Sequence, residues 1–82
     1  MYNVTVDEIV TDRLAAMPHD LMAAFGGILG QLCVDPWGQT SSSYSDDPRD
    51  AMRSMPFGNG GLVIYMVNET KRLVVVFDVI AL

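Results

Sequence analysis

The stretch GLVIYMVNETKRLVVVFDV, from Gly61 to Val79, decides how the rest of this 82-residue chain can fold. Two apolar runs flank the polar segment 68–72, and this arrangement is typical of a β-hairpin. Residues 73–77 are apolar at every position, which is usual for strands covered on both faces. Little chain is left to cover such a hairpin, so the central question is what packs on each of its faces.

The residues before the hairpin carry strand and helix patterns. MYNVTV alternates between apolar and polar residues and predicts a strand. Thr5 and Glu8 have the spacing of a capping box, which predicts a helix that ends near Met17. Pro18 suits the first position of a second helix, which continues to about residue 34. One stripe of that helix is apolar: Leu21, Phe25, Ile28 and Leu32.

The segment AMRSMPFG, residues 51–58, predicts a further strand, and Pro56 favours an edge position for it. The predicted order is therefore strand, helix, helix, strand, strand, strand. Tight turns make the last three strands an antiparallel meander, and the helix pair packs on one face of the sheet. We expect an α+β fold in a single domain, residues 1–82, with a mobile Ser-rich loop at 39–50.

The glycines at 26, 27 and 30 lie inside the predicted second helix. Each costs about 1 kcal/mol relative to alanine in a helix interior. Their presence predicts the close approach of another backbone to this helix.

Composition excludes several classes of function. The net charge is −5 with only five Lys and Arg residues. Nucleic-acid affinity depends on such cations, so we do not expect nucleic acid as a partner. Cys33 is the only cysteine, so no intrachain disulfide forms, as expected for a reducing cytoplasm. The longest apolar run, residues 21–34, is shorter than the roughly 20 residues of a membrane span. We expect a cytoplasmic protein without a membrane segment.

Few residues have the surroundings that catalysis or metal binding needs. His19 is the only histidine and has no ligand partner at a suitable helical spacing. Three aspartates at positions 46, 47 and 50 lack the spacing of a calcium loop. Cys33 and the serines at 41–43 have no second histidine to activate them. We therefore predict no metal and no cofactor.

Arg53 is the one cation that could serve a catalytic site. It shares a face of its predicted strand with Met55 and Phe57, where a side chain could approach a substrate. An ordinary surface arginine is the alternative interpretation.

Three phrases in order, RLAAMP, LGQLCVDPWG and the hairpin itself, resemble the RelE/ParE family of toxins from type II toxin–antitoxin modules. The resemblance runs from Tyr2 to Val79 and implies the same α+β fold. It also implies a bacterial protein whose partner is an antitoxin.

The nucleases of that family are ribosome-dependent endoribonucleases that use several basic residues around the hairpin. Here Arg53 is the only basic residue at such a position, and Gly61 or Leu62 stands where a hairpin arginine is expected. The chain stops at Leu82, so the family's C-terminal basic and aromatic segment is expected to be absent. The resemblance therefore implies weak or no nuclease activity. The ParE-like branch, which poisons DNA gyrase by protein contact, does not need these cations.

The alternative function is a non-catalytic interaction or homodimerisation module that retains the fold. A small-molecule site between loop and sheet is a third possibility that no sequence feature supports. Because the helices cover one face of the hairpin, we expect the other face to bind an antitoxin or a second copy of the chain. We predict that five residues line that face: Val63, Tyr65, Val67, Val74 and Val76.

Overall fold

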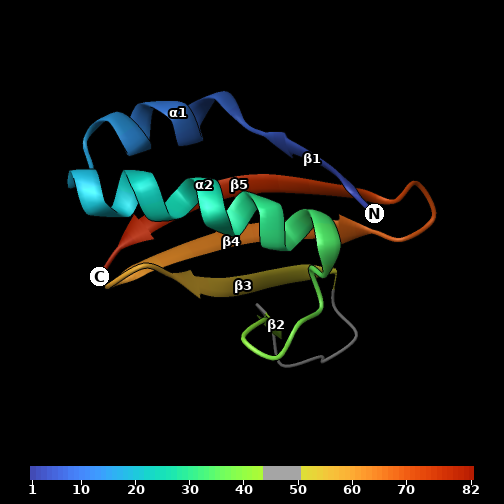
Figure 1. Cartoon of the computed structure of the whole chain (residues 1–82). Helices are drawn as coiled ribbons and strands as arrows, with labels where there is room; N and C mark the ends of the chain where they lie inside the picture. The colour runs from blue at the N-terminus through green and yellow to red at the C-terminus, as the bar shows by residue number, and fades with distance from the viewer. Residues whose placement is uncertain (44–50) are drawn as a thin grey trace.

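The computed structural model describes residues 1–43 and 51–82. Figure 1 shows two helices lying against one side of a five-stranded sheet. The elements in chain order are β1 (Asn3–Val6), α1 (Glu8–Ala15), α2 (His19–Val34), β2 (Ser42–Ser43), β3 (Met52–Phe57), β4 (Gly61–Asn68) and β5 (Leu73–Ala81). The predicted α+β fold, with an N-terminal strand, two helices and a final meander, is confirmed.

The strands lie in the order β1-β5-β4-β3-β2. β3, β4 and β5 form the expected antiparallel meander. β1 runs parallel to β5, with Asn3 opposite Leu73 and Val6 opposite Val76. The sheet is therefore mixed, and the N-terminal strand completes it next to the C-terminal one.

The predicted loop at 39–50 contains the short strand β2, which pairs with β3 through Ser42 opposite Ser54 and Ser43 opposite Arg53. The rest of that segment, residues 44–50, lies outside the described residues. The predicted mobility of the loop and the aspartates at 46, 47 and 50 therefore stay untested.

The first helix begins later than the capping-box pattern predicts. Asp7 is the N-cap of α1, and its side chain accepts a hydrogen bond from the Ile9 amide at 3.2 Å. Thr5 instead lies within β1, opposite Val75. The capping-box prediction is wrong because the strand continues to Val6, so helical geometry cannot start at Thr5. Pro18 is the N-cap of α2, close to the predicted position.

The core lies between α2 and the sheet. The predicted helix stripe is buried, with Leu32 fully inaccessible. Phe25 meets Phe57 of β3 edge to face, with ring centroids 5.7 Å apart and an interplanar angle of 68°. Such a pair adds about 0.5–1.5 kcal/mol beyond the area it buries. This contact fixes α2 over β3 at one end of the sheet.

The α2 glycines do not mark a close approach, so that prediction is wrong. All three lie on the exposed side of the helix, and a Cβ added at any of them would meet nothing within 4 Å. Close approach occurs instead at Gly61 of β4, where a Cβ would lie 2.7 Å from the Phe57 ring. Gly61 therefore points to the same face as Phe57, the face that the helices cover.

A β-bulge interrupts the pairing of β4 with β5. Tyr65 pairs with Val76 and Ile64 with Asp78, so Phe77 is the extra residue on β5. Without it, strict alternation would turn residue 79 away from the helices. With it, both Val76 and Val79 are buried under the helices, at 0% and 1% exposure.

Candidate functional site

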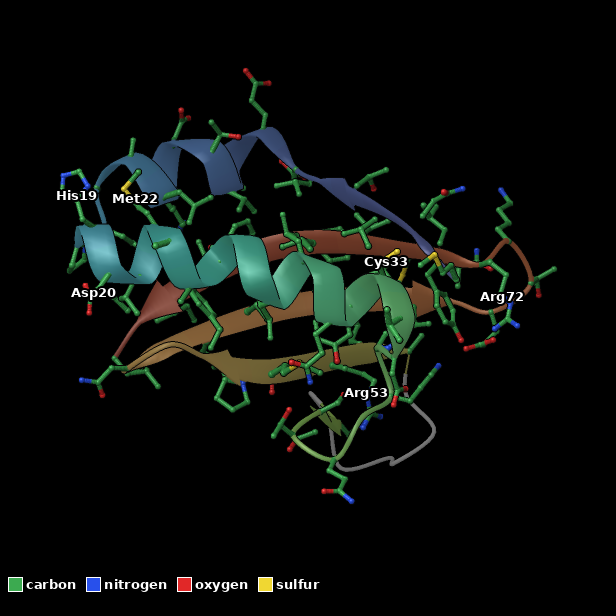
Figure 2. All side chains as sticks on the ribbon, viewed as in Figure 1. His19, Asp20, Met22, Cys33, Arg53 and Arg72 are labelled. Carbon is green, nitrogen blue, oxygen red and sulfur yellow. The ribbon has the colours of Figure 1, made fainter. Side chains whose placement is uncertain are left out.

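Arg53 lies at the end of the sheet below the last turn of α2 (Figure 2). Its side chain points to the helix-covered face and is only 9% exposed. The guanidinium lies 4.8 Å from the centroid of the Trp37 ring. Its Nε donates to the Ser41 hydroxyl at 2.6 Å, and its Nη2 donates to the Ser41 carbonyl at 3.3 Å. These contacts hold Arg53 against the segment that follows α2.

Tyr65 extends this network across to β4, where it pairs opposite Arg53. The Tyr65 hydroxyl donates to the Pro36 carbonyl, and the Ser41 hydroxyl lies 2.6 Å from it. Since the tyrosine proton is used by Pro36, Ser41 acts as the donor to Tyr65. Burial raises the pKa of Tyr65, although Ser41 and Arg53 oppose this. The phenol therefore stays protonated and serves as a structural hydrogen-bond donor.

The contacts of Arg53 are those of a residue that stabilises the fold. A catalytic guanidinium must be aimed at the position where negative charge develops on the reacting group. Here two of its N–H groups are directed at Ser41 and one face of its plane meets Trp37. The sequence pattern placed Arg53 correctly with Met55 and Phe57, since all three are buried on one face of β3. It could not reveal Ser41 or Trp37.

The structure contradicts the predicted positions of the five partner-binding residues. All five belong to the core under the helices: Val63, Tyr65, Val74 and Val76 are 0% exposed and Val67 is 3% exposed. The prediction assigned these alternating residues to the open face of the sheet, whereas they lie on the face that the helices cover. Gly61 shows which residues of β4 face the helices. It lies on the same face as Phe57, and so do the residues spaced by two from it.

The opposite side of the sheet carries neither α1 nor α2 (Figure 1). We call it the open face. Its apolar members alternate with the core residues along β3, β4 and β5: Met52, Pro56, Leu62, Ile64, Met66, Leu73, Val75, Phe77 and Ile80.

The open face is apolar and partly accessible. Phe77 is 37% exposed, while Ile64, at its centre, is 7% exposed although it lies outside the core cluster. Among the open-face residues of β3, β4 and β5, all of which are described, Asp78 is the one ionised side chain. Its carboxylate pairs with Arg13 of α1 at 2.9 Å. The face therefore presents an almost uncharged apolar surface.

A second polar cluster lies at the β4–β5 turn. One carboxylate oxygen of Glu69 accepts hydrogen bonds from the Tyr2 hydroxyl and from the Trp37 indole. Arg72 stacks on the Tyr2 ring at 4.9 Å and donates to the Tyr2 hydroxyl at 2.9 Å. The bond from Tyr2 lowers the pKa of Glu69, and the same bond raises the pKa of Tyr2. The cluster joins the N-terminus, the end of α2 and the hairpin turn.

Other sites that the sequence raised do not assemble. His19 is exposed at the start of α2, far along the helix from Cys33, whose thiol donates to the Tyr2 carbonyl at 3.1 Å (Figure 2). Among residues 1–43 and 51–82, no pocket forms and no three metal-ligating side chains converge. Neither of the described helices is long and apolar enough to cross a membrane.

Comparison by sequence and by structure gives different answers. No protein-family model matches the sequence, and no curated protein matches it significantly. The structure, however, is similar over 99% of the chain to one in the RelBE2 toxin–antitoxin complex of Mycobacterium tuberculosis. That match has a TM-score of 0.82, 17% identity and 98% coverage of the other chain.

Two further solved structures agree. The isolated RelE toxin of E. coli matches with a TM-score of 0.78 and 15% identity, over 99% of this chain and 84% of that one. A chain of the archaeal RelE–RelB complex from Pyrococcus horikoshii matches with a TM-score of 0.73 and 16% identity, over 98% and 93%. The mixed sheet and the helix pair on one face thus form the fold of the RelE toxins, as the sequence resemblance implied.

Proposed function

We propose that this chain is a RelE/ParE-like toxin-fold protein of a toxin–antitoxin module that acts by binding protein, with weak or no nuclease activity. The observation that carries the proposal is the open face, whose residues are mostly apolar and whose one carboxylate is paired with Arg13. Apolar patches of more than a few hundred Å² on small domains usually mark a partner site. The place of action would be the bacterial cytoplasm.

The size of the open face can be compared with that of known interfaces. Eight residues of β4 span about 27 Å, and three strands, each about 4.8 Å wide, make the face about 14 Å across. The face therefore covers about 400 Å², roughly half of what each partner contributes to a standard interface. A partner that also contacts surface beyond this face would bind more stably than one confined to it.

An antitoxin is the partner that the comparisons favour. Two of the similar structures are complexes of a RelE-type toxin with its antitoxin. The second candidate is a homodimer, which the near absence of charge on the open face favours. Two copies could meet there without opposing like charges.

The proposal of weak or no nuclease activity rests on the state of the described arginines. Arg13 pairs with Asp78, Arg53 is bound to Ser41, and Arg72 lies on Tyr2 beside Glu69. Stabilising a transferring phosphate needs preorganised cations aimed at the reacting group. The fourth arginine, Arg49, lies outside the described residues, so this argument covers only the other three.

Translating ribosomes provide the test of this point. Purified protein added to them should leave the mRNA uncut. Codon-dependent cleavage that disappears in Arg53→Ala would overturn it, because Arg53 would then be catalytic as well as structural.

Expression in a bacterium tests the binding role. We expect induction to arrest growth and Met66→Asp, in the middle of the open face, to relieve the arrest. Thr70→Asp, an exposed substitution in the hairpin turn, is the matched control and should leave the arrest unchanged. Arrest that survives Met66→Asp would refute the open face as the binding site. Normal growth with the unaltered chain would favour the interaction module, and sedimentation velocity would then show whether it is a dimer.

A further inference from the structure

The turn between β3 and β4 contains an asparagine that is directly followed by a glycine. Residues 58–60 join Phe57 to Gly61, which pair at the ends of the two strands. Asn59 and Gly60 are both exposed. Asparagine is chemically labile, because the main-chain nitrogen of the next residue can attack its side-chain amide carbon. A side chain on that next residue hinders the attack, and glycine has none.

The backbone of this turn leaves the two reacting groups accessible. Within residues 1–43 and 51–82, no hydrogen bond involves the Gly60 amide or the Asn59 side chain. The Gly60 carbonyl, in contrast, accepts a hydrogen bond from the Leu82 amide at 2.6 Å. Asn59 is flanked by glycines with φ angles of 56° at Gly58 and 93° at Gly60, which other residues adopt only with strain. The attack therefore needs no native hydrogen bond of these two groups to break first.

The other two asparagines of the chain are less suited to this reaction. Asn3 lies within β1, where pairing with Leu73 fixes an extended backbone. The next residue is Val4, whose branched side chain hinders approach to its nitrogen. The side-chain oxygen of Asn68 accepts a hydrogen bond from the Lys71 amide at 3.1 Å, which holds that side chain in the hairpin turn. Both residues therefore serve as comparisons within the same molecule.

We propose that Asn59 is a modification site at which the folded protein converts itself to isoaspartate and aspartate. The Gly60 nitrogen bonds to Cγ of Asn59, the Cγ–Nδ2 bond breaks, and ammonia leaves with the amide proton of Gly60. The product is a cyclic succinimide. Water then opens the ring at either carbonyl. Breaking the new N–Cγ bond gives aspartate, whereas breaking the original peptide bond gives isoaspartate.

Isoaspartate changes the turn, because the main chain then runs through the former side chain and gains a carbon atom. The turn has little room for this atom. Gly58 packs so closely on α2 that a Cβ there would lie 2.9 Å from the Cβ of Ala24. Leu82 holds the Gly60 carbonyl where β5 ends (Figure 1). We expect isoaspartate to break this bond or to loosen the β3–β4 pairing, whereas aspartate keeps the original backbone and should disturb the turn less.

The test is incubation of the folded full chain at neutral pH and growth temperature, followed by mass spectrometry of its peptides. Fragmentation identifies which residue has reacted and separates isoaspartate from aspartate. We expect Asn59 to be lost at least about tenfold faster than Asn3 or Asn68, which corresponds to a barrier lower by about 1.4 kcal/mol. Isoaspartate should be among the products, because it forms only when a succinimide ring opens.

Two variants separate the effect of the reaction from that of charge. Asn59→Gln keeps the amide but would have to form a larger ring, so it should stay unmodified and keep its urea midpoint throughout the incubation. Asn59→Asp carries the new charge on an unaltered backbone. The incubated unaltered protein should therefore unfold at lower urea concentration than Asn59→Asp. Both variants should fold, because residue 59 is exposed.

Three results would overturn the inference. The first is loss of Asn59 no faster than that of Asn68, and the second is aspartate without isoaspartate, which would indicate direct hydrolysis of the side-chain amide. The third is an intact Asn59 in the folded protein after a synthetic peptide of residues 55–62 has fully reacted, because the fold would then prevent the attack. An unchanged urea midpoint in isoaspartate-rich protein would refute the effect on the turn. The inference does not depend on the proposed function, which is tested separately by Met66→Asp.

Discussion

Val74 and Val75 are neighbours on β5 whose side chains lie on opposite faces of the sheet. Val74 is fully buried under the helices, whereas Val75 is a partly exposed member of the open face. Replacing Val74 by aspartate removes about 1.5–3 kcal/mol of side-chain burial. It also buries a carboxylate without a partner, which costs several kcal/mol more. A domain of 82 residues has a stability of about 4–12 kcal/mol, so we expect Val74→Asp to be largely unfolded.

Val75→Asp should retain the fold at a cost of about 1 kcal/mol, because its carboxylate stays hydrated. Urea unfolding followed by circular dichroism measures both variants, and the change in midpoint separates them. Partner binding or dimerisation should be lost in Val75→Asp. If Val75→Asp unfolds as readily as Val74→Asp, the open face is covered within the chain itself, and the assignment of a binding surface there is refuted.

Other predictions concern stability. Tyr65→Phe removes the hydrogen bond to Pro36 and should cost about 1–2 kcal/mol in urea unfolding; an unchanged midpoint would contradict a structural role for the phenol. Gly30→Ala should stabilise the protein by about 1 kcal/mol, because its Cβ meets nothing, whereas Gly61→Ala should destabilise it. Glu69 has a lowered pKa, so its stabilising effect is present above the ordinary value of 4.5 and is lost as the pH falls through its folded value. The urea midpoint should therefore fall more steeply with acidification in the unaltered protein than in Glu69→Gln, and parallel curves would contradict this.

The elements of the fold could be predicted because each carries a local pattern. The apolar stripe of α2, the position of Pro18 and the polar turn of the hairpin all lie within short windows. The faces of the hairpin were harder to assign. Residues 73–77 are apolar at every position, so no alternation of apolar and polar residues shows which of them face the core. The bulge at Phe77 then shifts the phase by one residue, and no sequence signal marks it.

The candidate sites depend on contacts between distant residues. Arg53 could be identified as unusual, but its partners come from a segment with no periodic pattern, so Ser41 and Trp37 could not be found. The position of β1 beside β5 was also inaccessible to sequence reasoning, because the parallel partner of Asn3 is Leu73, about 70 residues away. Hydrophobic patterns define elements, whereas long-range pairing defines which of their surfaces remain free.

The pairing of β1 with β5 also affects how the protein is made. β1 is synthesised before the other described elements, yet its neighbour in the sheet, β5, is synthesised after them. While translation proceeds, Val4 and Val6 therefore have no strand on either side, and the helices have no completed sheet to cover. Ordering of the nascent chain must wait until residues 73–76 emerge, and contacts of such large sequence separation form slowly. During this interval the apolar N-terminal strand is available to any molecule that binds extended chains, including a chaperone.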